Sequence, residues 1–468
     1  MARGQNTRYA GAGAGARASA PPARRLSTRN RELLYVALAG LTVVVGYSTV
    51  YLAQSKIVSA ASLTWGGFFV ALLLIAHLGL RIWAPLSDPY LLPATGMLCG
   101  IGITMIYRLN PDLASRQTIW LVVGIAVMFL VLFFIPDPRT LEQYKYVIGA
   151  GSVLALLITI SPLGHSVRGA KLWISIGAIN IQPGEFAKVG MVIFLAAYLR
   201  ENRELLRLKI SPKHLGPLLL FWGMSLALLV LMNDFGTSLL FYGSFLLMVY
   251  VATARLSYSV VGLLAFVGGS ALVYRIASHV QQRFDIWLDP WKDPQGSGYQ
   301  VIQGLFALAD GGLFGRGLGQ AYLVTGNGGT LIPDAHTDFI FAALGDELGF
   351  VGAVALLLVY LVFTWRGFAI AAACSDGFSK LLAFGLTTVF AMQTLIIVGG
   401  IVRLLPLTGQ TLPFISYGGS SIVANFLVMT LLLQLSHNIR AGQQRELAGA
   451  SGGAAPGRLR RAQVGGAS

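Results

Sequence analysis

The stretch LLAFGLTTVFAMQTLIIVGGIV, from Leu381 to Val402, decides the fold class because it contains no charged side chain. A transmembrane helix needs about 20 consecutive apolar residues to cross the hydrocarbon core of a bilayer. The run Ile119–Ile135 has the same character. A membrane β-barrel would instead show alternating segments of about ten residues. These continuous runs predict an all-α polytopic membrane protein.

The composition of the whole chain supports this prediction. Of its 468 residues, 55% are hydrophobic and only 11% are charged, whereas soluble domains carry about 25% charged residues. The mean hydropathy is +0.69. A soluble multi-domain enzyme, a disordered chain and a fibrous protein are therefore excluded.

Apolar runs recur along the chain and predict about 12 transmembrane helices, with a large extracellular loop between spans 9 and 10. We place the spans at about Leu33–Leu52, Leu63–Leu80, Leu91–Tyr107, Ile119–Ile135, Tyr146–Ile160, Phe186–Leu199, Leu218–Met232, Ser238–Ala252, Val260–Ile276, Phe339–Thr364, Leu381–Val402 and Ile422–Leu435.

The two ends of the chain differ from the apolar middle. Residues 1–30 are rich in Gly, Ala, Pro and Arg and have no apolar core, and residues 441–468 are again polar and basic. Both segments read as disordered basic tails. Residues 31–90 then supply two N-terminal helices ahead of a membrane core at 91–440. The two cysteines, Cys99 and Cys374, show no CxxC or Cys/His spacing, so neither a structural disulfide nor a zinc site is expected.

The net charge of +15 suggests either nucleic-acid binding or the lysine and arginine excess of cytoplasmic loops. With the N-terminus inside and alternating sides, 23 of the 34 Lys and Arg residues fall on the cytoplasmic side and 10 on the outer side. The charges therefore favour both termini in the cytoplasm. One short loop, residues 200–213, contributes five of the cytoplasmic charges.

The two longest internal loops, 161–185 and 277–337, both fall on the outer side of this topology, and long loops inside a compact protein usually have a task. In the first loop, Arg168 and Lys171 can bind a phosphate. Gln182 precedes a helix on which Glu185 and Lys188 lie three residues apart, so these two share a face and can pair. A purely structural ion pair and a substrate role are both open.

The second loop contains Asp293-Pro294-Gln295-Gly296-Ser297-Gly298, which predicts a turn with the Asp293 carboxylate at its tip. An ordinary Asx turn without chemistry is the alternative. Arg283 and Gln300 flank the turn, and Tyr299–Ala309 has the spacing of a short interfacial helix. The glycine-rich stretch 311–319 that follows lacks the lysine of a P-loop.

The remaining candidates lie where polar residues enter apolar spans. Ionisable residues at membrane depth are costly and usually line a cavity or find a partner. A proline-broken segment with glycines and polar groups at that depth is tolerated only where it is buried in protein or lines a water-filled cavity. Across all these stretches, the substrate-binding candidates are Arg168, Lys171, Gln182, Glu185, Lys188, Asp234, Arg283, Gln300, His336, Thr337, Asp338, Glu347, Arg403, Ser416 and Tyr417.

Five stretches in this order resemble the RodA/FtsW family, also called SEDS proteins. They are Gln182–Lys188, Asp234–Ser238, Asp293–Gln300, Pro333–Gly349 and Leu405–Ser421. The resemblance covers about Leu91 to Leu435, and two extra N-terminal helices are similar to actinobacterial RodA-type members. The sequence departs from the family at Gly184, where Ser is common, and at Asn233, where Pro is common.

The resemblance implies a peptidoglycan glycosyltransferase that polymerises lipid II outside the cytoplasmic membrane, during cell elongation if it is RodA-like. Asp293 matches the essential loop aspartate of the family and would act as general base, with undecaprenyl pyrophosphate as leaving group. Arg168, Lys188, Arg283 and Arg403 are the cations that would stabilise it. The resemblance also implies a class B penicillin-binding protein and other elongation or division proteins as partners, and a divalent cation, Mg or Mn, as a possible cofactor.

Three other functions remain open at this point: an FtsW-type septal polymerase, a lipid II flippase, and a non-catalytic scaffold that recruits division proteins. A flippase needs a polar path through the membrane and alternating access. The sequence instead concentrates its acids and bases at one face, which favours the enzyme.

Overall fold

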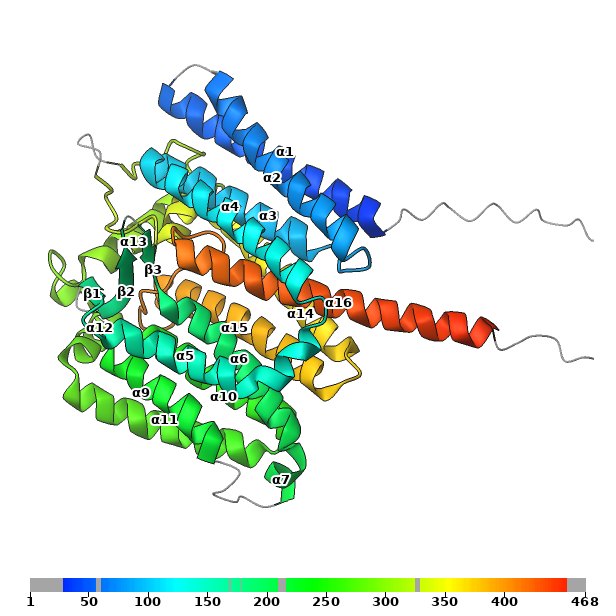
Figure 1. Cartoon of the computed structure of the whole chain (residues 1–468). Helices are drawn as coiled ribbons and strands as arrows, with labels where there is room; N and C mark the ends of the chain where they lie inside the picture. Colours follow the sequence, from blue (N-terminus) through cyan, green and yellow to red (C-terminus); the bar gives the residue numbers. More distant parts are fainter. Residues whose placement is uncertain are drawn as a thin grey trace, which may run out of the picture.

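The computed structural model describes residues 28–55, 60–167, 170–177, 179–208, 216–324 and 329–452 as a bundle of long helices with a small sheet at one end (Figure 1). In chain order the elements are α1 (Thr28–Ser55), α2 (Ala60–Trp83), α3 (Leu91–Leu109), α4 (Pro111–Phe134), η1 (Pro138–Tyr144), α5 (Lys145–Ile160), β1 (Gly164–Val167), β2 (Ala170–Ile176), β3 (Ile179–Ile181), α6 (Pro183–Glu201), α7 (Arg203–Leu208), η2 (Leu219–Gly223), α9 (Met224–Leu231), α10 (Phe235–Thr253), α11 (Leu256–Ile276), α12 (Ser278–Leu288), η3 (Pro290–Lys292), α13 (Tyr299–Gly311), α14 (Ile340–Ala373), α15 (Gly377–Ile401) and α16 (Gly419–Gly452).

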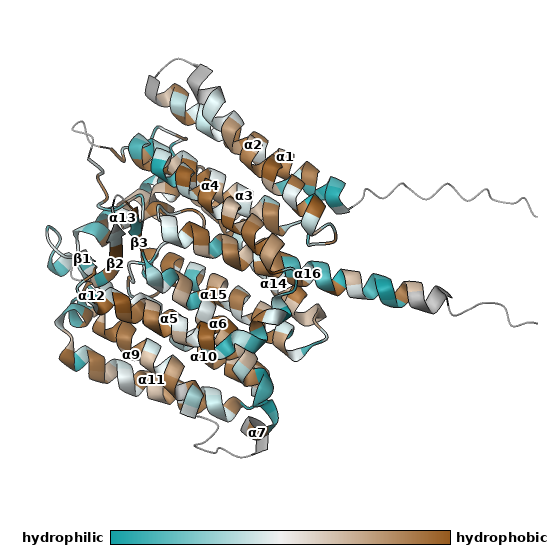
Figure 2. Cartoon of the chain, in the orientation of Figure 1, coloured by the Kyte–Doolittle hydropathy of each residue, from teal (hydrophilic) through white to brown (hydrophobic). Residues whose placement is uncertain are grey.

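Ten helices in the described part of the chain are long and apolar enough to cross a membrane, which confirms the all-α polytopic membrane fold. The other two predicted spans fall on α6 and on the shorter apolar helix Gly216–Leu231. The number twelve therefore stays a prediction. Figure 2 shows hydrophobic residues along the middle of most helices and hydrophilic ones at their ends, as a bilayer requires.

Helices begin where a polar side chain can accept hydrogen bonds from the unpaired N–H groups of the first turn. The Asn110 side chain accepts from the backbone N–H of Asp112 at 3.0 Å ahead of α4. Asp376 accepts from the N–H of Ser379 at 2.8 Å ahead of α15. These caps fix the ends of two spans whose limits the apolar pattern alone leaves open.

Aromatic packing joins the spans to the segment that follows α15. The rings of Phe363 on α14 and Phe390 on α15 stack with centroids 4.1 Å apart. Phe414 packs against Phe390 at 5.9 Å, and all three side chains are buried. This cluster holds the non-helical segment 402–418 inside the bundle.

The loop 161–185 forms a three-stranded antiparallel sheet in the order β1-β2-β3. His165 pairs with Trp173, and Ser175 pairs with Asn180. The sheet, α12 and α13 lie at one end of the bundle, whereas the start of α1 and the end of α16 lie at the other (Figure 1). The sequence analysis predicts the long loop but not its strands, because the apolar alternation of β2, at positions 170, 172, 174 and 176, spans only seven residues.

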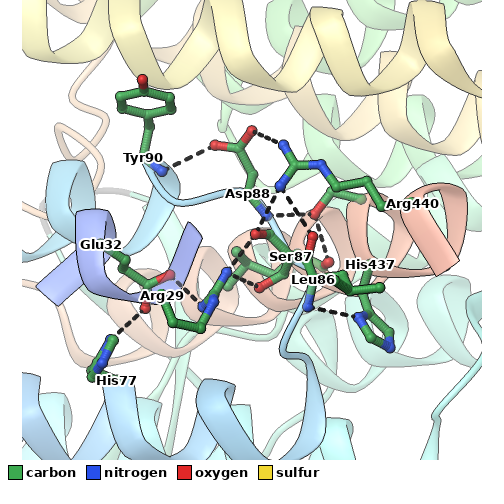
Figure 3. Close-up of polar contacts among 11 residues, drawn as sticks. Arg29, Glu32, His77, Leu86, Ser87, Asp88, Tyr90, His437 and Arg440 are labelled. Carbon is green, nitrogen blue, oxygen red and sulfur yellow. Dashed lines mark hydrogen bonds and ion pairs between the residues drawn. The ribbon is translucent and has the colours of Figure 1, made fainter. Parts of the chain in front are cut away.

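A buried polar cluster lies at the opposite end, around the connection between α2 and α3 (Figure 3). Asp88 is fully buried and pairs with Arg366 of α14 and, at 3.4 Å, with Arg440 of α16. Arg29 of α1 donates to the Ser87 backbone oxygen. Charges from four separate segments thereby fasten the N-terminal helices to the core.

The structure corrects part of the predicted C-terminal tail. Helix α16 continues to Gly452, so residues 441–452 are helical where the sequence predicts a disordered tail. The polar composition of this stretch is also compatible with an exposed helix beyond the bundle, as Figure 2 shows. Residues 1–27 and 453–468 lie outside the described part of the chain.

The glycine-rich loop, residues 311–319, packs against a break in α14. Gly349 has φ +68°, a conformation that favours glycine. The Phe350 N–H donates to the Gly312 oxygen at 2.8 Å, and the Gly317 N–H donates to the Glu347 oxygen at 3.0 Å. The loop therefore satisfies backbone groups that the helix break would leave unpaired. This role explains the glycines without a phosphate ligand.

Candidate active site

A cavity of about 450 Å³ lies between α12, the start of α13 and the segment 400–409. We call it the polar cavity. Its polar lining residues are Asn233, His279, Gln282, Arg283, Ser297, Gln300, Asp338 and Arg403. Four of these, Arg283, Gln300, Asp338 and Arg403, are predicted site residues that the fold brings together from three distant stretches of sequence.

The two arginines of the cavity also dock α12 onto the segment after α15. Arg283 Nη1 donates to the backbone oxygens of Leu407 at 3.1 Å and Thr408 at 2.9 Å. Arg403 Nη2 donates to the Trp287 oxygen at 2.8 Å, and the Trp287 indole donates back to the Arg403 oxygen at 3.0 Å. Both guanidinium groups are thus held at the cavity wall in fixed positions.

Charge in the cavity is predominantly positive. Burial lowers the pKa of Arg283 from its ordinary value, and the carboxylates of Asp338 and Asp234 oppose that shift. An arginine nonetheless stays protonated in proteins. Burial and the charge of Arg283 also lower the pKa of His279, so this imidazole is neutral at pH 7. The cavity therefore suits an anion.

Asp293 follows η3 at the edge of the polar cavity and forms the predicted Asx turn. Its Oδ1 accepts from the Gly296 N–H at 3.1 Å. Its Oδ2 accepts from the Ser297 N–H at 2.7 Å and the Ser297 hydroxyl at 2.9 Å. A Cβ at position 296 would collide with Oδ2, so any other residue there would displace the carboxylate from these hydrogen bonds.

These three donors stabilise the ionised form of Asp293. The backbone and hydroxyl hydrogen bonds of Ser297, followed by that of the Gly296 N–H, hold the pKa of Asp293 below its ordinary value. Asp293 itself is exposed, whereas Ser297 lines the cavity. The carboxylate is therefore an accessible, ionised proton acceptor one hydrogen bond away from the cavity wall.

Glu185 and Lys188 are buried and pair on one face of α6, with Oε2 and Nζ 2.8 Å apart. Lys188 Nζ also donates to Gln393 Oε1 of α15 at 2.9 Å. Gln393 Nε2 in turn donates to the Thr411 oxygen at 2.8 Å. We call the series Glu185, Lys188, Gln393 and Thr411 the buried chain. The pair thus has a structural role, and its predicted substrate role remains a prediction.

Asp234 caps α10 by accepting from the Thr237 N–H at 3.0 Å, and it also accepts from Gln410 Nε2 at 3.0 Å. The residue before it, Asn233, has φ +61°. Proline cannot adopt this angle because its ring fixes φ near −65°. The departure from the family pattern at position 233 is therefore accompanied by a turn that excludes proline.

Backbone contacts join the two predicted stretches around His336 and Tyr417. The Tyr417 N–H donates to the His336 oxygen at 2.8 Å. The Ser416 hydroxyl donates to the Thr337 oxygen at 2.6 Å. Asp338 follows directly and lines the polar cavity. These hydrogen bonds hold Asp338 in position. A contact of His336, Thr337, Ser416 or Tyr417 with a substrate stays a prediction.

Glu347 lies apart from the polar cavity, on the side of α14 that faces α3. Its Oε1 accepts from Arg108 Nε at 3.1 Å, and its Oε2 accepts from the Gly319 N–H at 2.9 Å. Arg108 Nη2 donates to the Ala321 oxygen at 2.8 Å. The arrangement clamps the glycine-rich loop, which accounts for a buried carboxylate at this depth.

The predicted residues of the first loop have different surroundings. Lys171 Nζ donates to the Ile160 oxygen at 2.8 Å, which fastens the sheet to α5. The Gln182 backbone N–H donates to the Ser420 hydroxyl at 2.9 Å. Gln300, by contrast, lines the polar cavity while its amide donates to the Pro333 oxygen at 2.8 Å. Arg168 lies outside the described residues.

An apolar groove of about 630 Å³ runs between α10 and α11 and adjoins the polar cavity, with which it shares two lining residues. Aromatic and aliphatic side chains form most of its wall, including Trp222, Tyr242 and Phe266. Arg283 and Leu407 line both the groove and the cavity. The junction can therefore accept an amphiphile with an anionic head and an apolar tail.

Sequence reasoning missed four polar cavity residues, Asn233, His279, Gln282 and Ser297. His279 and Gln282 precede Arg283 on α12, Ser297 is part of the Asp293 turn, and Asn233 lies in the turn before α10. The spacing of His279 and Arg283, four residues apart on a helix, is a signal that places both on one face. Ser297 gives no such signal, since serine in a turn is common.

The sequence model of the FtsW/RodA/SpoVE family, described as a cell cycle protein, matches residues 90–441. The chain belongs to this family. It is 41% identical over 434 residues to the peptidoglycan glycosyltransferase RodA of Mycobacterium tuberculosis, and the match covers 88% of this chain and 91% of that protein. Helices α1 and α2 precede the family region.

Two solved structures are similar to the fold. One, from work on the structural coordination of polymerization and crosslinking by a peptidoglycan synthase complex, has a TM-score of 0.63 at 26% identity and covers 75% of this chain and 98% of that chain. The other is the rod shape determining protein RodA of Thermus thermophilus, with a TM-score of 0.53 at 27% identity, covering 75% and 97%. Both matches support the multi-pass membrane fold.

Proposed function

We propose that this chain is a peptidoglycan glycosyltransferase that polymerises lipid II into glycan strands, with Asp293 as the general base. The observation that carries the proposal is the junction of three features. An ionised carboxylate lies next to a cationic cavity, and an apolar groove shares the lining residues Arg283 and Leu407 with that cavity. The family membership and the name of the mycobacterial relative agree with this activity.

The reaction needs one proton acceptor and one stabilised leaving group. Asp293 takes the proton of the acceptor sugar's 4-hydroxyl while that oxygen forms a bond to the anomeric carbon of the donor. The bond between the anomeric carbon and the diphosphate oxygen breaks, and the electron pair leaves with undecaprenyl pyrophosphate. A base of this kind must come within about 3 Å of the hydroxyl, which the exposed turn allows.

Arg283 and Arg403 are placed to stabilise the departing diphosphate. Each guanidinium has five N–H donors, and the hydrogen bonds of Arg283 to protein carbonyls use Nη1. Positive groups held in fixed positions act on developing charge without reorganising during the reaction. The undecaprenyl tail would lie in the apolar groove, whose junction with the cavity is at Arg283.

We also propose that the polar cavity is at the outer face and that both termini are cytoplasmic, in the inner membrane of a bacterium. The bias of Lys and Arg supports this orientation. In addition, the start of α1 and the end of α16 lie at one end of the bundle, opposite the sheet, α12 and α13 (Figure 1). The acceptor strand would then grow where cell wall is assembled.

A class B penicillin-binding protein is the partner that we propose, together with other elongation or division proteins. The similar structure described as a peptidoglycan synthase complex supports the first of these. We infer a role in cell elongation because the mycobacterial relative is a RodA. Complementation of a strain depleted of RodA, compared with one depleted of FtsW, tests that role.

The resemblance implies a divalent cation, Mg or Mn, as a cofactor. Among the described residues, no group of three or more His, Cys, Asp or Glu side chains is arranged to hold a metal. We therefore propose that any required cation is bound by the substrate's own diphosphate. Addition of a chelator to the polymerisation assay tests this point.

The decisive experiment is polymerisation of lipid II by the purified protein in liposomes, with and without the penicillin-binding partner. Wild type should produce glycan polymer and Asp293→Ala should produce almost none. Asp285→Asn is the matched control, since it removes an exposed carboxylate from α12 that does not line the cavity. Wild type that moves lipid II across the bilayer but makes no polymer would support the flippase instead.

A further inference from the structure

Ser297 is the residue that links the Asp293 carboxylate to the polar cavity. It lines the cavity wall, whereas Asp293 is not among the lining residues. Its hydroxyl and its backbone N–H both donate to the same carboxylate oxygen, Oδ2, at 2.9 and 2.7 Å. The serine is therefore placed to control how the carboxylate meets a ligand in the cavity.

The hydrogen bonds distinguish the two oxygens of Asp293. Each oxygen of an ionised carboxylate has two lone-pair sites. Both sites of Oδ2 are used by Ser297, whereas Oδ1 has one donor, the Gly296 N–H at 3.1 Å. One acceptor site on Oδ1 is thus left for an incoming hydroxyl.

We propose that Ser297 is a positioning residue for Asp293: by occupying Oδ2, it makes Oδ1 the atom that takes the proton of the acceptor sugar. The inference rests on the proposed function. The proton moves from the acceptor hydroxyl to Oδ1, and Ser297 keeps its own proton throughout. Misplacement of reacting atoms by about 1 Å can cost 10²-fold in rate, so one anchoring hydrogen bond has a measurable effect.

Replacement of Ser297 by alanine separates this role from folding of the loop. Ser297→Ala keeps the backbone donors of residues 296 and 297 and so keeps the turn, but it frees one site on Oδ2. Ser297→Thr restores a hydroxyl. Ser278→Ala is the matched control, because Ser278 is exposed at the start of α12 and does not line the cavity.

The experiment measures kcat and KM for lipid II polymerisation by the full-length protein with its partner. Ser297→Ala should lower kcat about tenfold while KM changes less than about twofold, because the hydroxyl acts on the base and not on substrate affinity. Ser297→Thr should recover kcat to within about threefold of wild type. Ser278→Ala should match wild type in both constants.

The outcomes that overturn the inference are distinct from those that overturn the proposed function. An unchanged kcat in Ser297→Ala, or a rise in KM alone, refutes positioning even when wild type is active and Asp293→Ala is inactive. A failure of Ser297→Thr to recover activity, with a normal unfolding temperature, also refutes it. Inactive wild type, or active Asp293→Ala, overturns the proposed function and this inference together.

Discussion

The Asp293 turn and the buried chain are two polar regions built in opposite ways. The turn is exposed and draws its three hydrogen-bond donors from residues within four positions of Asp293. The buried chain joins Glu185 and Lys188 to the Gln393 side chain of α15, about 200 positions away, and through it to the backbone oxygen of Thr411. The comparison teaches that a local turn can be altered at little cost in stability, whereas each member of the buried chain holds helices together.

The largest effect should come from Asp293→Asn. Asparagine keeps an acceptor for the Gly296 N–H, but it places an amide NH2 where Oδ2 accepts from Ser297, and it cannot take a proton, so polymerisation should fall about 10³-fold. The free energy of unfolding should fall by about 1 kcal/mol, because the turn is exposed and water can replace the lost acceptor. Activity assays and thermal unfolding in detergent measure the two quantities. A large loss of stability would break the comparison.

Lys188→Ala should produce the opposite result. The substitution leaves the Glu185 carboxylate buried without its cation, which costs about 3 kcal/mol of unfolding free energy. The double substitution Glu185→Gln with Lys188→Met removes both charges and should recover most of that loss. Unfolding midpoints of the three proteins test the expectation. Equal midpoints in wild type and Lys188→Ala would refute the structural role.

A smaller effect is expected at the cavity wall. Arg283→Lys keeps a positive charge but loses the planar array of N–H donors. These donors hold the side chain against Leu407 and Thr408 and would bind the diphosphate, so KM for lipid II should rise about tenfold. Arg275→Ala removes an exposed arginine of α11 and should leave KM unchanged. Steady-state kinetics distinguish the two variants. A KM of Arg283→Lys equal to that of wild type would show that Arg283 does not bind the diphosphate.

The smallest effect concerns pH. Asp293 must be ionised to act as base, and its three donors hold its pKa below the ordinary value. Wild type should therefore keep its rate on acidification until the pH falls through that lowered pKa. In Ser297→Ala the loss of the hydroxyl donor raises the pKa, so the rate should begin to fall at a higher pH. Identical pH–rate profiles would contradict the contribution of Ser297.

Much of the fold and part of the site can be predicted from sequence. Charge-free runs such as Leu381–Val402 predict spans because the bilayer imposes their length, and the turn at Asp293 is encoded by adjacent Asp, Pro and Gly residues. The short helix predicted at Tyr299–Ala309 is confirmed as α13. These features depend on neighbours in sequence.

Features that depend on distant contacts could not be predicted. Gln393 and Gln410 are ordinary polar residues in sequence, and only the packed helices show that they bind Lys188 and Asp234. The same holds for the clamp between Glu347 and Arg108, which gives a structural partner to a residue predicted to bind substrate. The twelve helical residues after Arg440 were missed because a solvated helix has no apolar periodicity.

The interlocking of the glycine-rich loop with the break in α14 sets limits for protein engineering. An inserted residue between Gly312 and Gly317 would shift the register of the backbone hydrogen bonds that close the break. Epitope tags and fluorescent reporters should therefore avoid this loop, even though it lies between helices. The end of α16 extends about 18 Å past Arg440 at 1.5 Å per residue, and it offers the better attachment point for a fusion.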